Sequence, residues 1–133
     1  MTVHLVYPAD ARRAAAPWSI GNALLAALTA AGRRVAQYDW EDRGCIEPHA
    51  GDMLVGHPHP DGDRVFNASV SAPGWARLVG ISPWNGSDEY RRNIEAVLPR
   101  CDRYFAICGP YWAERMPATW RHVSALDMAV DPV

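Results

Sequence analysis

The sequence predicts one α/β domain built on a mostly parallel sheet. Short apolar segments alternate with segments of helical spacing, and several apolar segments are continuous, as in strands covered on both faces. With 133 residues, of which 49% are hydrophobic and 21% charged, the chain is long enough for one domain with a real core. Together these observations predict a single Rossmann-like domain with about five strands and with helices on both faces of the sheet.

Five strands are expected from short apolar runs. The first covers 3–8, where Pro8 ends the run, and it is followed by strands over 33–40, 51–58, 75–83 and 103–109.

Two helices are expected between these strands. The first covers 17–32, where apolar residues recur at helical spacing between an opening proline and a closing glycine. The second covers 87–99, where Ser87 can cap the helix and acidic residues favour its first turn. One or two helical turns are expected over 110–116, and 61–74 fits either a short helix or an irregular loop.

Composition excludes several classes of protein. The net charge of −2 gives no indication of a partner bound by charge, such as a nucleic acid or an anionic membrane, which would call for a clustered basic face. No segment approaches the roughly 20 apolar residues of a membrane span, and the N-terminus lacks the pattern of a signal peptide. Cys45, Cys101 and Cys108 are too few and too irregularly spaced for a disulfide framework or a metal site. Reduced thiols in a cytoplasmic protein are therefore expected.

Residues just beyond the strands are the candidate site residues, because parallel sheets bind ligands outside the carboxyl ends of their strands. These residues are polar or aromatic after all five strands, which suits a small polar or sugar-like ligand. The candidates for substrate binding are Asp10, Trp84, Asn85, Tyr111 and Trp112. Trp40 could also stack on a ligand. The alternative is that these segments are ordinary polar loops.

The segment "GHPHP" (56–60) follows the third strand. Each proline fixes its own backbone and holds the preceding residue extended, so His57 and His59 are expected on a stiff loop. A neutral imidazole can act as a general base or hydrogen-bonding group, and both histidines are candidate catalytic residues. A metal would need three or four ligands, and no nearby pattern completes such a set. Neither a metal nor a cofactor is expected, and a structural turn is the alternative.

The motifs "YP", "PWSIGNALLAAL", "YDW", "GDMLVGHPHP", "YFAICGPYW" and "LDMAVDP" extend along nearly the whole chain. In this order they resemble the N-terminal domain of two-domain glycosyltransferases of the GT-B architecture. The resemblance implies that residues 1–121 bind the sugar acceptor and that 122–133 lead toward a second domain, which would hold the nucleotide-sugar donor. It also implies that His57, His59, Asn85 and Tyr111 face the cleft between the two domains.

On this interpretation the chain alone transfers no sugar, because the groups that bind the donor belong to the second domain. The cleft face would be exposed and could support self-association. Two other functions remain open. The chain could be a non-catalytic interaction module that partners another subunit, or a fragment of a nucleotide-sugar epimerase of similar architecture.

Overall fold

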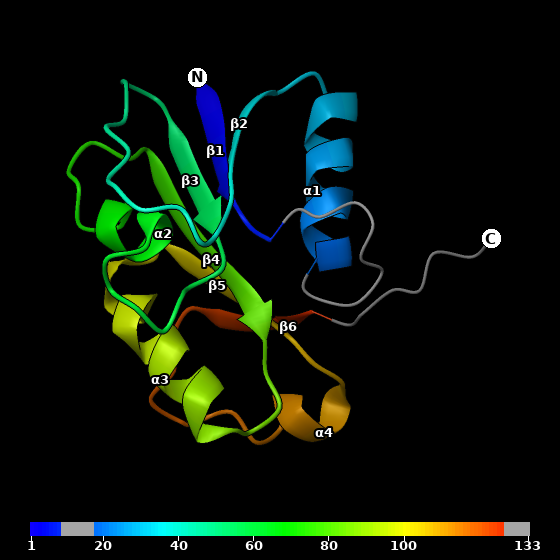
Figure 1. Cartoon of the computed structure of the whole chain (residues 1–133). Coiled ribbons are helices and arrows are strands. Elements are labelled where there is room, and N and C mark those ends of the chain that lie inside the picture. Colours follow the sequence, from blue (N-terminus) through cyan, green and yellow to red (C-terminus); the bar gives the residue numbers. More distant parts are fainter. Residues whose placement is uncertain (9–17, 127–133) are drawn as a thin grey trace.

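The computed structural model describes residues 1–8 and 18–126, and within these ranges six strands form one sheet (Figure 1). The strands are β1 (Thr2–Val6), β2 (Arg34–Tyr38), β3 (Met53–Gly56), β4 (Arg77–Pro83), β5 (Arg103–Ile107) and β6 (Val123–Leu126). They lie in the order β2-β1-β3-β4-β5-β6, and every neighbouring pair is parallel. The predicted α/β class with a Rossmann-like parallel sheet is confirmed.

The helices are α1 (Trp18–Ala30), α2 (Val65–Ser69), α3 (Asp88–Val97) and α4 (Pro110–Ala113), with a 3₁₀ turn, η1 (Leu98–Arg100), after α3. Helix α3 begins as the sequence predicts, because the Ser87 hydroxyl accepts a hydrogen bond from the backbone N–H of Tyr90. The segment that fitted either a helix or a loop contains the short helix α2.

Helices lie on both faces of the sheet (Figure 1). The larger core lies between the sheet and helices α2 and α3, and it includes Leu54, Phe66, Ile94 and Tyr104. A smaller cluster on the other face packs against α1; its buried members are Leu5, Tyr7, Ile81 and Ile107.

Strand β6 is one more strand than the sequence indicated. It occupies part of the segment 122–133 that was expected to lead out of the domain, and it pairs with β5 along its length. Its four residues, VSAL, include a serine and are partly or fully exposed, so they lack the continuous apolar run that identified the equally short strand β3. In the described part of the chain, no helix has the length and apolar character needed to cross a membrane.

The direction of strand addition changes once in the sheet. The chain places β2 on one side of β1 and β3 on the other, and later strands continue on the β3 side. The carboxyl ends of β1 and β3 therefore flank the topological switch point, which is where open α/β sheets bind ligands.

Candidate functional site

Four aromatic rings meet beyond the carboxyl ends of β1, β2 and β3. The Trp40 ring lies edge-on to His57 and to His59, with ring centroids 4.8 and 4.6 Å apart. The Tyr7 ring is edge-on to His57 at 5.4 Å. We call Tyr7, Trp40, His57 and His59 the switch-point site. The segment "GHPHP" thus lies at the expected end of its strand, and the fold adds Tyr7 and Trp40 to it.

His57 offers an unprotonated ring nitrogen to this site. Its Nδ1 lies 2.7 Å from the Pro58 carbonyl oxygen, and because a carbonyl only accepts, Nδ1 must carry the proton. Nε2 then holds a lone pair, and no described residue hydrogen-bonds to it. Burial lowers the pKa of His57 to about 4, so the ring is neutral at pH 7. His57 is therefore equipped to accept a hydrogen bond from a ligand.

His59 differs, because both of its ring nitrogens already have partners. Nδ1 accepts a hydrogen bond from the Asp61 backbone N–H at 2.9 Å, and Nε2 donates to the Glu41 carboxylate at 3.1 Å. The Asn67 side-chain amide also bonds the backbone N–H and carbonyl of His59, at 2.9 and 2.8 Å. These contacts make His59 an anchor of its loop, while its catalytic role stays a prediction.

Glu41 joins the elements around this loop. Besides His59, its carboxylate accepts hydrogen bonds from Trp40 Nε1 at 3.0 Å and from Arg64 Nε at 3.4 Å. The hydrogen bond from His59 is the main cause that lowers the pKa of Glu41. Sequence reasoning did not identify Glu41 or Asn67, because their contacts with His59 span 18 and 8 residues and follow no local motif.

Tyr7, whose ring lies edge-on to His57, has an unused hydroxyl. Its side chain is fully buried, yet the hydroxyl has no hydrogen-bond partner within the part of the chain that the structure describes. Burial, together with nearby Tyr90, raises the pKa of Tyr7 above its usual value, so the phenol keeps its proton. A buried polar group without a partner costs about 1–3 kcal/mol. Tyr7 is thus a hydrogen-bond donor still to be satisfied.

The other predicted residues gather beyond β4 and β5. Trp84 is buried; its indole N–H donates to the Trp112 carbonyl at 3.1 Å, and its ring packs edge-on to Trp112 and Trp120. Asn85 accepts a hydrogen bond from the backbone N–H of Ser87 at 3.1 Å.

Tyr111 is 58% exposed, and the Arg115 guanidinium lies 3.5 Å from its ring centroid. Trp84 therefore packs in the core, whereas Tyr111 is accessible. Among the described residues, no hydrogen bond, ion pair or ring contact joins this group to the two histidines. Asp10 lies outside the described residues.

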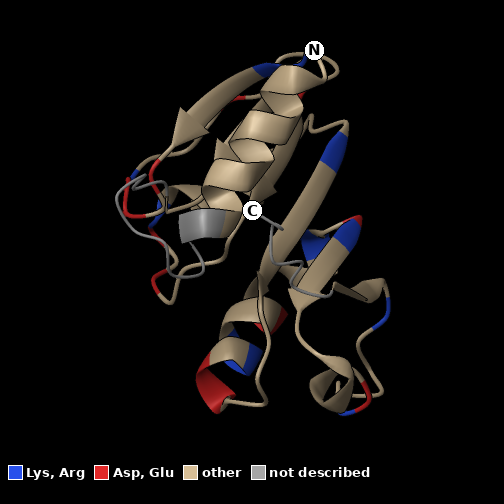
Figure 2. Ribbon diagram, turned by 90° about the vertical axis from the view of Figure 1, so that its right-hand side faces the viewer, with Lys and Arg blue, Asp and Glu red and all other residues tan. Residues whose placement is uncertain are grey.

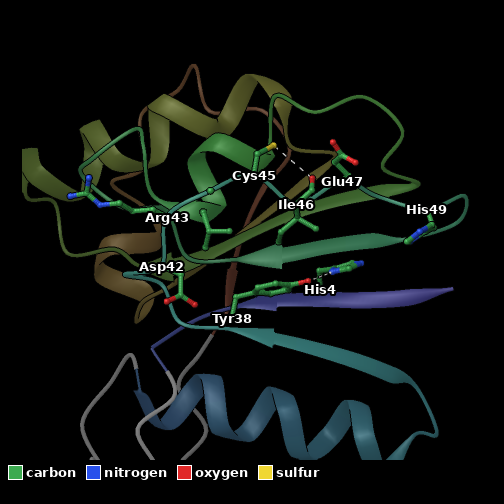
Figure 3. A pocket seen from close by; sticks show the side chains of 10 residues that line it. His4, Tyr38, Asp42, Arg43, Cys45, Ile46, Glu47 and His49 are labelled. Carbon is green, nitrogen blue, oxygen red and sulfur yellow. Dashed lines mark hydrogen bonds between the residues drawn. The ribbon is translucent and has the colours of Figure 1, made fainter.

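A pocket of about 530 Å³ lies between β1, β2 and the loop after β2 (Figure 3). Its floor holds His4 and Tyr38, which point toward one another. His4 Nε2 lies 2.9 Å from the buried Asp52 carboxylate, so Nε2 carries a proton, and His4 Nδ1 forms a hydrogen bond of 2.9 Å with the Tyr38 hydroxyl. Tyr38 therefore already has a hydrogen-bond partner at the floor of this pocket.

Asp52 connects the hydrogen bonds of His4 and Tyr38 to the protein backbone. Its carboxylate also accepts from the backbone N–H groups of Thr2 and His49, at 2.8 and 3.0 Å. The hydrogen bond from His4, followed by those two, holds the pKa of Asp52 well below its usual value. These hydrogen bonds hold the amino ends of β1 and β3 together, and no local sequence pattern predicts them.

Among the described residues, no group of three or more His, Cys, Asp or Glu side chains could hold a metal ion, and the cysteines form no disulfide. Comparison of the chain with protein-family models, with curated proteins and with solved structures found no match.

Proposed function

We propose that this chain is the acceptor-binding domain of a glycosyltransferase and that an acceptor hydroxyl binds at the switch-point site. The observation that carries the proposal is the lone pair of His57 Nε2, neutral and without a partner among the described residues, beyond the carboxyl end of β3. The resemblance of the motifs to the N-terminal domain of GT-B enzymes supplies the reaction class.

The chemistry of glycosyl transfer needs such a group. The acceptor oxygen forms a bond to the anomeric carbon while the bond to the leaving diphosphate breaks, and the hydroxyl proton passes from the acceptor oxygen to the departing diphosphate. His57 Nε2 can accept the hydrogen bond from that hydroxyl and so direct its oxygen lone pairs. With a pKa of about 4, His57 is a weak base, and we assign it the orientation of the hydroxyl.

Tyr7 makes the site selective for alcohols. A hydroxyl group donates one hydrogen bond and accepts others, so it can donate to His57 and accept from Tyr7. An ammonium group cannot accept from Tyr7, and a carbonyl cannot donate to His57. The partly buried Trp40 ring adds an apolar surface of the kind that lines sugar sites.

Saturation-transfer NMR with D-glucose, D-mannose and glycerol tests the proposal on the whole chain. We expect the wild-type protein to bind at least one of these probes. His57→Ala and Tyr7→Phe should each weaken binding about tenfold, since each removes a hydrogen bond that leaves a polar partner unpaired.

Two control variants complete the experiment. His122→Asn alters an exposed histidine whose positive φ asparagine tolerates, and Tyr38→Phe removes the hydroxyl that lines the other pocket. Both should bind like the wild type. Loss of binding in Tyr38→Phe alone would place the ligand in that pocket, and absence of binding to every probe would contradict the proposal.

A further inference from the structure

Six arginines lie along one edge of the sheet, at the positions where strands begin. Because the strands are parallel, their amino ends lie on a common edge. Figure 2 shows mostly blue at the starts of several strands, and both red and blue in the helix and loops toward the opposite end. We call the following six exposed residues the arginine edge: Arg33, Arg34, Arg77, Arg100, Arg103 and Arg121.

The arginine edge is not neutralised by ion pairs. None of its six members pairs with a carboxylate of the described residues, whereas four arginines elsewhere do. The carboxylates near the edge are Asp52, Asp102 and Glu47. Asp52 is buried and holds three hydrogen bonds, and Asp102 accepts from the Leu78 backbone N–H. Six guanidinium groups therefore outnumber the acidic groups beside them.

Most exposed carboxylates lie at the other end of the molecule. They follow strands β2 to β5 and comprise Asp39, Glu41, Asp42, Asp61, Asp63, Asp88, Glu89 and Glu114. A strand of five residues spans roughly 16 Å, about twice the Debye length of about 8 Å at physiological salt. Salt therefore screens a partner at the arginine edge from the carboxylates at the other end. The net charge of −2 does not report this uneven distribution of charged residues.

We propose that the arginine edge docks on the surface of a membrane that contains anionic phospholipids. The six neighbouring strands cover roughly 24 Å at a spacing of about 4.8 Å, and guanidinium groups lie at or before the starts of four of them, β2, β4, β5 and β6. Guanidinium groups suit lipid phosphates, because each offers several donors in one plane. This inference does not depend on the proposed sugar site.

Two observations favour a lipid surface over a nucleic acid. Met1, at the start of β1 on the same edge, is 57% exposed and can enter the headgroup region. Nucleic-acid binding surfaces combine basic residues with aromatic rings for stacking or with a helix that enters a groove. The members of the arginine edge begin or precede strands or lie in the 3₁₀ turn η1, and none of them lies on an α-helix that could enter a groove.

Co-sedimentation with vesicles tests this proposal. We expect the whole chain to bind vesicles of phosphatidylglycerol and phosphatidylcholine, to bind more weakly as salt is raised, and not to bind phosphatidylcholine alone. The double variant Arg77→Gln/Arg103→Gln should lower the partition coefficient about thirtyfold, because each basic residue near an anionic surface contributes about fivefold. Both residues are exposed and lack ion pairs within the described residues, so the fold should persist.

The control is Arg43→Gln/Arg92→Gln, which changes the net charge equally but lies away from the arginine edge. It should bind vesicles like the wild type. Equal weakening by both double variants would show that only net charge matters and would overturn the proposal. So would an absence of binding to the anionic vesicles. Binding to duplex DNA or RNA that is tighter than to vesicles, and lost with Arg77 and Arg103, would assign the edge to nucleic acid instead.

Discussion

The burial of His57 couples its protonation to folding. The imidazole has an ordinary pKa of 6.5, and burial lowers it to about 4 in the folded protein. Between these values the unfolded chain binds a proton that the folded chain does not. Protons therefore favour unfolding in this interval, and the stability that the neutral ring provides is present above pH 6.5 and lost as the pH falls to 4.

We expect the free energy of unfolding to decrease by about 3 kcal/mol from this group between pH 6.5 and pH 4. Urea denaturation at a series of pH values measures it. His57→Gln should flatten the dependence in that interval, while His122→Asn should keep it. An unchanged slope in His57→Gln would mean that His57 is not the group responsible.

Sequence reasoning could place the histidines but not distinguish them. Prolines and a preceding apolar strand were enough to predict that both lie on a loop beyond β3. The distinction between them comes from the Pro58 carbonyl, the Asp61 N–H and the Glu41 carboxylate, whose positions depend on the folded loop. From the sequence, Tyr7 is only a member of the apolar strand expected over 3–8. The structure shows that its hydroxyl is buried without a hydrogen-bond partner among the described residues.

Because Gly80 in β4 has no side chain, the Tyr104 ring of β5 can pack directly against its backbone. Gly80 pairs with Tyr104 across these strands, and a Cβ atom at Gly80 would collide with the Tyr104 ring. The space lets the buried Tyr104 hydroxyl reach the Ser82 hydroxyl at 2.6 Å. The glycine therefore serves both the packing of the ring and the pairing of its hydroxyl.

Gly80→Ala should destabilise the protein by about 1–3 kcal/mol, because the added methyl overpacks the core and displaces the Tyr104 ring. Thermal unfolding measures the change. Gly62→Ala is the matched control, since nothing lies within 4 Å of a Cβ there and its φ is not positive. Equal melting temperatures for the two variants would refute this account of the β4–β5 contact.

Elements with a clear hydrophobic period or a continuous apolar run were predictable from the sequence, and elements with neither were not. Helix α1 and helix α3 follow from apolar spacing and from the capping residue Ser87. Helix α2 has only five residues, and strand β6 lacks the continuous apolar run that identified the equally short strand β3. Both are stabilised by the sheet against which they lie, which is a tertiary effect.

The two faces of the sheet bury unequal amounts of apolar surface. Helix α3 contributes Ile94 and Val97 to the larger core, and both are almost fully buried. The apolar side chains of α1 that the structure describes, such as Leu24 and Leu25, are only partly buried. Local opening is easiest where few buried contacts must break.

We therefore expect the amides of α1 to exchange with deuterium before those of α3. Hydrogen exchange with peptide-level mass spectrometry under native conditions measures both helices in one sample. Peptides from the central strand β4 provide the internal reference for global unfolding. Protection of α1 equal to that of β4 would show that the smaller cluster is as stable as the larger core.

The uneven distribution of arginines over the surface is a property of the whole fold and is not visible in the linear sequence. The six residues of the arginine edge are spread from position 33 to position 121, and the parallel sheet brings them to one side. The prediction that no partner binds through charge relied on the net charge of −2 and on the lack of any sign of a clustered basic face. Neither observation shows which residues the folded sheet brings together at the ends of its strands.

The parallel pairing also sets an order of events during synthesis. Val3 in β1 pairs with Met53 in β3, so that edge of β1 has no partner until the chain has grown past residue 53. At about 5–20 residues per second, a ribosome needs roughly 2–10 s to synthesise the intervening segment. Throughout this time the nascent chain carries an apolar strand with one open edge. The speed of translation, and not only the final stability, therefore influences how much of the chain reaches the native sheet.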